Sequence, residues 1–502
     1  MSALRSVLIA NRGEIAVRVI RACQQLGIEA IAVYSTADAE ALHVKLADRA
    51  ICIGPPHPLK SYLNPSAIIS AAKLSDAEAI HPGYGFLAEN ADFAALCGEH
   101  EIIFIGPSAE VIRQMGEKVG ARTLMSEIGL PVLPGSEVIA TPKQLASEAQ
   151  RIGLPLIIKA VGGGGGRGMK IVARPPDLPN AWQTARREAG AAFGNDAVYL
   201  ERFIEKPRHI EVQVAIDNYG NGIYLGAREC SIQRRHQKLI EEAPSPLFDA
   251  EDQEALCSNA LQAAMAVGYR SLGTIEFLVD DEGECYFIEM NTRIQVEHTV
   301  SEMVTGIDMV QLQLRMAGGE RLTLAQDAVC FRGHAIECRI NAEDPETRVG
   351  SAGTVSELHL PSGFGVRVDS ALYPGCKVPP FYDSLIAKLV AWGDDRESAI
   401  ARMLQALAET RIEGVQTNRG LHQQLLQDAA FVRGEYDVSL LSAWPYAEAP
   451  QAANPANGNG PRRQQGGPGK RRQPPPAGAT AAADKRPARP VASKGRRPPG
   501  GG

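Results

Sequence analysis

The first 115 residues alternate between short apolar runs and segments whose apolar residues recur at helical spacing. The run SVLIA at 6–10 has the unbroken hydrophobic character of a buried strand, and residues 11–27 repeat their apolar positions as a helix does. Further strand-like runs lie at 28–35, 50–54, 79–83 and 102–106, with a helical segment at 65–74. Such alternation is typical of a parallel sheet with helices on its faces. The sequence therefore predicts an α/β domain over residues 1–115.

The first strand-to-helix turn of this domain does not carry a dinucleotide-binding fingerprint. It reads Asn-Arg-Gly-Glu at 11–14 and contains one glycine, whereas the pattern G-x-G-x-x-G needs three. We therefore reject a Rossmann-type nucleotide site in this part of the chain.

Length and composition indicate a soluble protein of several domains. At 502 residues the chain exceeds one ordinary core, and its 44% hydrophobic and 22% charged residues are normal for globular proteins. No run of about eighteen apolar residues occurs, which argues against a transmembrane helix, and the N-terminus lacks the apolar segment of a secretory signal. The nine cysteines are scattered without a C-x-x-C pair, which favours reduced thiols over a metal knuckle. We expect a cytoplasmic protein.

The C-terminal part of the chain differs from the rest in composition and charge. Between 451 and 502 there are eleven Lys or Arg and one acid, Asp484, so this tail carries +10, and the body carries −16 because the whole chain carries −6. A segment rich in Pro, Gly and Ala cannot bury a core, so we expect residues 448–502 to be disordered. Such a tail could bind nucleic acid or an acidic protein. We favour the simpler interpretation of a solvated linker.

Five consecutive glycines at 162–166 join two strand-like runs at 154–160 and 169–173. Glycine lets backbone N–H groups approach phosphate oxygens closely, but a Walker loop would end in Lys-Ser/Thr and open a helix. Here a strand follows, so we expect a hairpin flap that closes over bound phosphates, with Lys159 in reach of one. The alternative is a flexible surface hairpin without a ligand.

A second hairpin carries carboxylates at strand spacing. Two apolar runs flank the polar turn 280–284, and with a period of two the side chains of Cys285, Phe287, Glu289 and Asn291 are expected on one face, with Glu276 on the partner strand facing the same way. Two carboxylates and an amide oxygen form a hard oxygen set that suits Mg²⁺ together with nucleotide phosphates. The alternative is a solvent-facing row of charges, which fits less well because the flanking runs are apolar.

Further charged side chains lie near this hairpin in the sequence. Arg293, Gln295 and Glu297 follow directly, and a cation beside a carboxylate suits anion binding and general-base catalysis. Upstream, the segment at 233–238 offers His236 and Lys238, which share a face if the segment is extended. Together with the glycine loop, these groups converge on Mg-ATP chemistry.

Several longer motifs resemble one enzyme family. The chain is similar to biotin carboxylase, the ATP-grasp component of acyl-CoA carboxylases, from residue 5 to about residue 440. The strings that carry the resemblance are KAVGGGGGRGM (159–169), HPGYGFLAEN (81–90), SIQRRHQK (231–238), FIEMNTRIQVEH (287–298), RGHAIECRINAEDP (332–345) and PPFYDSLIAKL (379–389).

The resemblance implies a fold and a reaction. The fold would comprise an N-terminal α/β domain (1–115), an ATP-grasp linker and mobile lid (116–204), a C-terminal ATP-grasp and biotin carboxylase domain (205–447) and the tail (448–502). The reaction would use Mg-ATP to phosphorylate bicarbonate, and the resulting carboxyphosphate would carboxylate the ureido N1 of biotin. This is the first half-reaction of an acyl-CoA carboxylase, and we expect acetyl-CoA carboxylase in fatty acid synthesis.

The resemblance also implies roles for individual residues. ATP would be bound by Lys118, Lys159, Gly165, Gly166, Glu201, Ile204, His209, Gln233, His236, Glu276 and Glu289. Two Mg²⁺ or Mn²⁺ ions would be held by Glu276, Glu289 and Asn291. Bicarbonate would be held by Lys238, Arg293, Gln295, Val296 and Arg339. The catalytic residues would be Lys238, Arg293, Glu297 as the base for bicarbonate, and Arg339, which would stabilise the biotin enolate; biotin would lie near Tyr84 and Arg339.

The same resemblance implies partners. Family members that carry their own biotin attach it to the lysine of a Met-Lys-Met motif, and the only Met-Lys pair here, Met169-Lys170, lies beside the glycine loop and precedes Ile. We therefore expect a separate biotin carboxyl carrier protein, carboxyltransferase subunits and a homodimer, with no membrane partner. The sequence departs from the family pattern at Val161, at Arg202 and in the longer turn 280–284, none of which removes a catalytic group.

Two other functions compete with this interpretation. Another ATP-grasp ligase, such as a carbamoyl-phosphate or purine-pathway enzyme, would share the lid and the metal ligands but would lack the strings at 81–90 and 332–345. A nucleic-acid-binding or scaffold protein could act through its basic tail and carry a degenerate enzyme body. The second is disfavoured because the complete polar set is present: Glu276, Glu289, Asn291, Arg293, Glu297 and Arg339.

Overall fold

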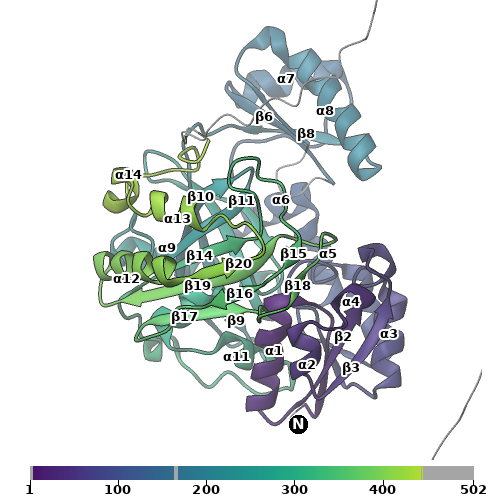
Figure 1. The fold of residues 1–502 in the computed structure, drawn as a ribbon. Coiled ribbons are helices and arrows are strands. Elements are labelled where there is room, and N and C mark those ends of the chain that lie inside the picture. The colour runs from purple at the N-terminus through teal and green to yellow at the C-terminus, as the bar shows by residue number, and fades with distance from the viewer. Residues whose placement is uncertain (1–3, 163–167, 443, 445–502) are drawn as a thin grey trace, which may run out of the picture. The chain divides into compact units, whose positions relative to one another are not determined.

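The computed structural model describes residues 4–162, 168–442 and 444, all within the unit that ends at residue 449 (Figure 1). Its N-terminal part is a five-stranded sheet in the order β3-β2-β1-β4-β5, and every neighbouring pair is parallel. The strands are β1 (Ser6–Ile9), β2 (Glu29–Ser35), β3 (Arg49–Gly54), β4 (Ala79–His81) and β5 (Ile103–Phe104). The helices of this part are α1 (Gly13–Gln25), α2 (Leu42–Leu46), α3 (Pro65–Leu74), α4 (Ala91–Glu99) and α5 (Ala109–Gly116). The predicted α/β arrangement is confirmed.

The central strand β1 shows why its sequence is apolar throughout. Val7 and Ile9 pack in one core with the buried face of α1, whereas Leu8 points to the opposite face and packs in a second core with residues of α3 and α4. A strand covered on both faces has no solvent-facing position, so alternation of apolar and polar residues is absent. Asn64 and Asn90 accept backbone N–H groups at the starts of α3 and α4, which fixes where these helices begin.

A smaller antiparallel sheet contains the strands that flank the glycine run. Its order is β7-β6-β8, with β6 (Leu156–Ala160), β7 (Met169–Val172) and β8 (Val198–Arg202). Helices α7 (Pro142–Ile152) and α8 (Leu178–Phe193) contribute apolar side chains to one core with these strands. Lys159 pairs with Met169 at the end of the ladder, so the predicted strand-loop-strand hairpin is confirmed. Gly165 and Gly166 lie outside the described residues, and the predicted closing lid therefore stays a prediction.

The largest element is an eight-stranded antiparallel sheet in the order β13-β12-β9-β10-β11-β14-β19-β17. Its strands are β9 (Arg208–Ile216), β10 (Gly222–Arg234), β11 (Gln237–Ala243), β12 (Ser271–Val279), β13 (Cys285–Asn291), β14 (His334–Asn341), β17 (Val366–Ser370) and β19 (Leu385–Gly393). Helix α9 (Ala250–Ala266) contacts β9 and β10, α10 (His298–Thr305) contacts β10, β11 and β14, and α12 (Arg396–Glu409) contacts β14 and β19. Helices therefore cover much of the sheet.

Short elements complete the described part of the chain. The helices are α6 (Lys118–Ile128), α11 (Met309–Ala317), α13 (Arg419–Leu425) and α14 (Ala429–Arg433), and the strands are β15 (Gly353–Thr354), β16 (Glu357–His359), β18 (Lys377–Val378) and β20 (Arg411–Glu413). No helix among the described residues is long and apolar enough to cross a membrane. All nine cysteines are free thiols, as the sequence predicted.

One buried ionic cluster ties the large sheet to the C-terminal helices. The Glu242 carboxylate on β11 accepts hydrogen bonds from His334 Nε2 at 2.5 Å, from Arg396 Nε at 2.7 Å and from the Tyr436 hydroxyl. Burial by itself raises the pKa of the Glu242 carboxyl, but the bonds from His334 and Arg396 outweigh it and lower the pKa to about 2. Ionised Glu242 therefore stabilises the fold.

We predict that Glu242→Gln lowers the free energy of unfolding at pH 7 by about 3 kcal/mol, the value of a pKa depressed from about 4.5 to about 2. Because the folded-state pKa lies below the ordinary value, this stabilisation is present above about pH 4.5 and is lost as the pH falls towards about 2. Urea unfolding followed by circular dichroism over this pH range measures both effects. The exposed Glu254→Gln on α9 is the control, and an equal loss in both variants would contradict the prediction.

Candidate active site

The polar hairpin of β12 and β13 contains an irregularity that decides which side chains face the site. Glu276 lies directly opposite Glu289, and Thr274 lies opposite Asn291, whereas the next pair is Phe277 with Phe287. One strand advances by one residue and the other by two, so residue 288 is an extra residue, a β-bulge. Glu276, Glu289 and Asn291 therefore share one face, as predicted.

The prediction that Cys285 and Phe287 share this face is wrong. Beyond the bulge the alternation is inverted, so Phe287 faces the same way as Phe277 and packs with it in the core that includes α9 residues. Cys285 packs against that core as well. A strict period of two cannot reveal an inserted residue, because a bulge preserves the apolar character of the strand and changes only which face each side chain takes.

The Glu276 carboxylate has more polar partners than the other carboxylates of the site. Its Oε1 accepts from Lys238 Nζ, Asn291 Nδ2 and Gln295 Nε2, each at 2.8 Å, and its Oε2 lies 3.2 Å from His209 Nε2. Burial raises the pKa of Glu276, but Lys238 and His209 more than reverse this and hold the pKa well below its usual range. Glu276 is therefore ionised, and its carboxylate oxygens are available as metal ligands.

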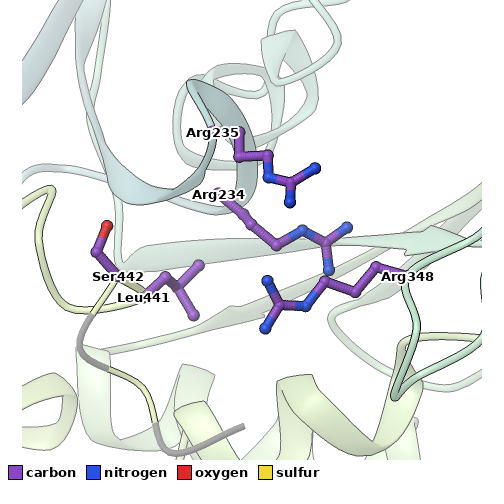
Figure 2. A pocket seen from close by; sticks show the side chains of 5 residues that line it. All are labelled: Arg234, Arg235, Arg348, Leu441 and Ser442. Atoms are coloured by element: carbon purple, nitrogen blue, oxygen red, sulfur yellow. The ribbon is translucent and has the colours of Figure 1, made fainter. Parts of the chain in front are cut away.

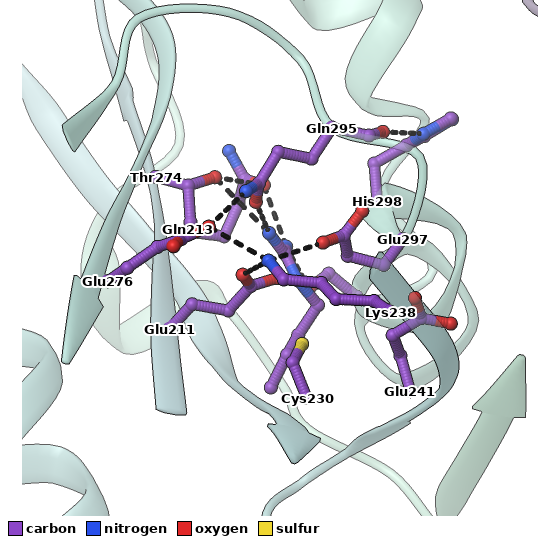
Figure 3. Close-up of polar contacts among 12 residues, drawn as sticks. Glu211, Gln213, Cys230, Lys238, Glu241, Thr274, Glu276, Gln295, Glu297 and His298 are labelled. Carbon is purple, nitrogen blue, oxygen red and sulfur yellow. Dashed lines mark hydrogen bonds and ion pairs between the residues drawn. The ribbon is translucent and has the colours of Figure 1, made fainter. Parts of the chain in front are cut away.

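Lys238 joins three buried carboxylates from different elements (Figure 3). Its Nζ lies 2.5 Å from Glu211 on β9, 2.8 Å from Glu276 on β12 and 2.8 Å from Glu297 at the start of α10. An ammonium group has three N–H donors, and here each donor has a carboxylate. The pKa of Lys238 is raised well above its ordinary value because these carboxylates outweigh the effect of burial, which lowers it.

The segment at 233–238 is a tight hairpin turn. Arg235 and His236 have φ values of 52° and 64° and connect β10 to β11, and Lys238 pairs across the turn with Gln233. The segment is therefore not extended, so the condition under which His236 and Lys238 would share a face is not met. The turn instead places Lys238 beside Gln233, whose Nε2 contacts His209 Nδ1 at 2.9 Å.

Glu297 lies between two cations. Its Oε1 is 2.8 Å from Lys238 Nζ and its Oε2 accepts from Arg339 Nη2 at 2.9 Å. Burial raises the pKa of Glu297, but Lys238 and Arg339 reverse this and hold the pKa well below its usual range. The carboxylate is therefore ionised at neutral pH, which is the state that a general base requires.

Arg339 also contacts a carboxylate that sequence reasoning missed. Its Nη2 lies 2.5 Å from Glu241 Oε1, and Glu241 lies directly across the sheet from Glu337. Burial raises the pKa of Glu241 to about 7, against the opposing effect of Arg339. In the sequence, Glu241 is one member of a charged run with no motif to mark it.

Tyr84, the predicted neighbour of biotin, lies within the electrostatic reach of Arg339. Its hydroxyl donates to the buried Glu14. Burial raises the pKa of the Tyr84 phenol well above its ordinary value, and Arg339 is among the charges that oppose this rise. The structure therefore brings the two predicted biotin residues into one region, although Tyr84 lies in the loop after β4 and Arg339 lies on β14.

The remaining predicted bicarbonate ligands lie just after the C-terminal end of β13. Arg293 donates from Nε to Glu89 at 3.0 Å and from Nη2 to Asn291 Oδ1 at 2.7 Å, and Glu89 comes from the motif at 81–90. The Val296 carbonyl accepts from Lys388 Nζ at 2.8 Å. The structure therefore brings residues 89, 291 and 293 into direct contact although about two hundred positions separate Glu89 from the other two.

The predicted ATP residues fall into two groups. Lys118 Nζ lies 3.1 Å from Glu289 Oε2 at the polar hairpin. Lys159 forms an ion pair with Glu201 across β6 and β8, and Ile204 follows β8 by two residues. The first group lies at the large sheet, which Lys118 reaches from the start of α6, and the second group belongs to the small sheet. Gly165 and Gly166 lie outside the described residues.

A separate pocket of about 290 Å³ lies beside the β10–β11 turn (Figure 2). It is lined by Arg234, Arg235, Arg348, Leu441 and Ser442. Arg234 forms an ion pair with Glu343 at 2.6 Å. None of the predicted site residues within the described part of the chain belongs to this lining, so the polar site is a distinct feature built around Lys238.

A parallel N-terminal sheet, a small sheet with a glycine-rich connection and a large antiparallel sheet with paired carboxylates define an ATP-grasp ligase. Family models match the chain at residues 3–112 (biotin carboxylase, N-terminal domain), 117–325 (carbamoyl-phosphate synthase L chain, ATP binding domain) and 337–443 (biotin carboxylase C-terminal domain). The chain belongs to the biotin carboxylase family. Models named for biotin carboxylase match on both sides of the central ATP-binding region, which favours this family over the carbamoyl-phosphate interpretation.

Similar proteins support this assignment. The biotin carboxylase of Nostoc is 55% identical over 87% of this chain and 98% of its own length. A pyruvate carboxylase component of Methanothermobacter thermautotrophicus is 50% identical over 87% of this chain and 89% of its own. The biotin carboxylase domain of Hydrogenobacter thermophilus 2-oxoglutarate carboxylase, solved as a dimer with MgADP, ADP and bicarbonate, is 48% identical with a TM-score of 0.85 and covers 88% of this chain and 98% of that domain.

The oxygen donors of the polar hairpin fit a divalent cation. Glu276, Glu289 and Asn291 present hard oxygen atoms from two adjacent strands, with Glu276 and Glu289 directly opposite each other. Magnesium prefers such ligands and keeps the remaining positions for water and phosphate oxygens. The hairpin is therefore suited to a metal–nucleotide complex.

We predict that Glu289→Gln raises the Mg²⁺ concentration for half-maximal ATP hydrolysis at least about 10-fold, because one anionic ligand is lost. Glu282→Gln in the exposed turn of the same hairpin is the matched control and should leave the Mg²⁺ dependence unchanged. Identical Mg²⁺ curves for the two variants would remove Glu289 from the metal site.

Proposed function

We propose that this chain is the biotin carboxylase component of acetyl-CoA carboxylase in fatty acid synthesis and acts on biotin held by a separate biotin carboxyl carrier protein. The observation that most directly supports this reaction is the position of ionised Glu297 between Lys238 and Arg339. The Nostoc relative, named biotin carboxylase without an acceptor, matches over almost its whole length and is more similar than the relatives named for pyruvate or 2-oxoglutarate carboxylation, which favours an acceptor other than these keto acids.

Glu297 is proposed to remove the proton from bicarbonate. Bicarbonate is a poor nucleophile until it loses this proton, so a fixed carboxylate increases its reactivity. The cations that keep Glu297 ionised, Lys238 and Arg339, also weaken it as a base. Both are proposed bicarbonate ligands as well, so they would lower the pKa of the bound bicarbonate and offset that weakness. The resulting dianion would attack the γ-phosphorus of ATP, release ADP and form carboxyphosphate.

The proposed nucleotide ligands come from both groups of predicted ATP residues, and the proposed metal ligands come from the β12–β13 hairpin. ATP would be bound by Lys118, Lys159, Glu201, Ile204, His209, Gln233 and His236 together with Gly165 and Gly166. Glu276, Glu289 and Asn291 would hold two Mg²⁺ or Mn²⁺ ions, which neutralise phosphate charge when bound. The Hydrogenobacter domain was solved with MgADP and bicarbonate, which supports both assignments.

Arg339 is proposed to stabilise the negative charge that develops on biotin. Deprotonation at N1 builds an enolate on the ureido oxygen, and a guanidinium group near Tyr84 stabilises such an oxyanion. Carboxyphosphate would supply the carboxyl group to N1, and the phosphate that leaves would take up the N1 proton. Because Arg339 is held by Glu241 and Glu297 on either side, its charge is fixed in place without a substrate contact.

We predict that Arg339→Ala reduces biotin-dependent turnover at least about 100-fold, the order of effect for loss of one oxyanion-stabilising group. The far-ultraviolet circular dichroism should stay that of the parent, because the side chain lies at the site and not within an apolar core. Arg411→Ala, which removes a guanidinium paired with Glu357 at the surface, is the control. Parent-like turnover of Arg339→Ala would eliminate the assigned role.

The acyl acceptor is tested by reconstitution. The purified chain, a biotinylated carrier protein and the carboxyltransferase subunits from the same organism are mixed with Mg-ATP and labelled bicarbonate. Acetyl-CoA, propionyl-CoA, pyruvate and 2-oxoglutarate are then compared as acceptors. We expect label in malonyl-CoA. Transfer only to a keto acid would overturn the acetyl-CoA assignment and would leave the biotin carboxylase reaction intact.

The proposal includes the organisation of the protein. We propose domains at 1–115, 116–204 and 205–447, a cytoplasmic location and a homodimer; the dimer is supported by the Hydrogenobacter domain, which was solved as one. The assignment of residues 448–502 as a basic linker falls outside the described residues and stays a prediction from composition.

A further inference from the structure

A fully buried arginine lies beneath the bicarbonate end of the site. Arg228 on β10 has no exposed surface. Its Nε donates to Glu211 Oε1 at 2.5 Å, its Nη1 donates to Gln213 Oε1 at 2.7 Å and to Ser301 Oγ at 3.1 Å, and its Nη2 donates to Gln295 Oε1 at 2.6 Å and to Thr274 Oγ1 at 3.2 Å. A guanidinium group has five N–H donors, so every donor of Arg228 has an acceptor.

The bond to Gln295 fixes the orientation of that amide. A guanidinium group only donates, so it selects the amide oxygen of Gln295 and turns the amide nitrogen the other way. The nitrogen then donates to Glu276 Oε1 at 2.8 Å. The reversed amide would place its oxygen against the Glu276 carboxylate, which is repulsive. Arg228 thus determines which atom Gln295 presents to the site.

The bond to Glu211 fixes the position of Lys238. One oxygen of Glu211 accepts from Arg228 and the other lies 2.5 Å from Lys238 Nζ. Glu211 therefore bridges the two cations. Figure 3 shows Glu211, Glu276 and Glu297 converging on the Lys238 ammonium group. If the bridge moved, Lys238 would lose one of its three anchors.

Arg228 cannot act by touching a substrate, because it has no exposed atom and its five donors are engaged. Its influence reaches the site through Gln295 and Glu211, and Glu211 leads to Lys238. Both Gln295 and Lys238 are proposed bicarbonate ligands. The proposed nucleotide ligands Lys118 and Lys159 pair with other glutamates, at positions 289 and 201, so their anchors do not include Arg228.

We infer that Arg228 is a positioning residue for bicarbonate, which sets the amide of Gln295 directly and the ammonium group of Lys238 through Glu211. This inference rests on the proposed assignment of Gln295 and Lys238 as bicarbonate ligands. It predicts a selective effect: loss of the guanidinium fork should impair bicarbonate binding more than ATP binding, which Arg228 reaches only through the contacts of Gln295 and Lys238 with Glu276. A purely structural role for Arg228 would instead lower the melting temperature and the active fraction, and would leave the KM for bicarbonate unchanged.

The test is Arg228→Lys, which keeps the charge but cannot reach five acceptors. The KM for bicarbonate and for ATP are measured from bicarbonate-dependent ATP hydrolysis at saturating Mg²⁺. We expect the KM for bicarbonate to rise on the order of 10-fold or more, as for a displaced binding group, and the KM for ATP to stay within about 2-fold of the parent value. The matched control is Arg396→Lys, another largely buried arginine paired with a glutamate but remote from Lys238 in its contacts. It should leave both KM values unchanged.

Four outcomes overturn the inference or its basis. An unchanged KM for bicarbonate in folded Arg228→Lys overturns it, as does an equal rise in both KM values. If Arg228→Lys does not fold, the second variant is Thr274→Val, which removes one acceptor from the Arg228 nitrogen that also bonds Gln295. It should raise the KM for bicarbonate about 3-fold, the effect of losing one weak hydrogen bond. An unchanged KM for bicarbonate in Thr274→Val overturns the inference. A parent protein without bicarbonate-dependent hydrolysis would instead overturn the proposed function.

Discussion

The Lys238 ammonium group holds the centre of the large sheet together. It is the common partner of Glu211, Glu276 and Glu297, which come from β9, β12 and the start of α10. Burying several like charges close together is strongly unfavourable unless cations compensate them. Arg228 and Arg339 supply further positive charge to Glu211 and Glu297. The strand order β12-β9-β10-β11-β14 therefore places Glu211, Glu276 and Glu297 next to cations that compensate them.

This charge balance bears on how the site would bind its substrates. Bicarbonate and phosphate are anions, and the cations proposed to hold them already have carboxylate partners. Bicarbonate would therefore share Lys238, Arg293 and Arg339 with carboxylates that stay in place, and it would add its own negative charge to the buried cluster. The cations make this addition possible, because an anion buried without a positive partner is unfavourable.

Local backbone irregularities give the site its geometry. The bulge at residue 288 turns Glu289 and Asn291 to the face of Glu276 while Phe287 stays in the core. The turn at Arg235 and His236 brings Lys238 opposite Gln233. In the sequence, both segments look like uninterrupted strands, because the residue types on either side of each irregularity are those of strands. Period-based reasoning therefore predicted the hairpin of Glu276 correctly and misplaced Cys285 and Phe287, and the segment that would put His236 and Lys238 on one face if extended is a turn.

The sequence by itself determined the alternating α/β start, the hairpin around the glycine run, the carboxylate hairpin and the family, because each depends on local spacing or on contiguous motifs. Only the tertiary structure decided which distant residues meet. Arg228 lies beside Glu229 in β10, and Glu211 shares β9 with other polar residues, so nothing in their neighbourhood along the chain distinguishes them from a solvent-facing charge. Their roles arise from strand pairing, which places positions 211, 228, 238, 276 and 297 around one buried point. Their burial around Lys238, which strand pairing sets, makes these charged residues part of the site.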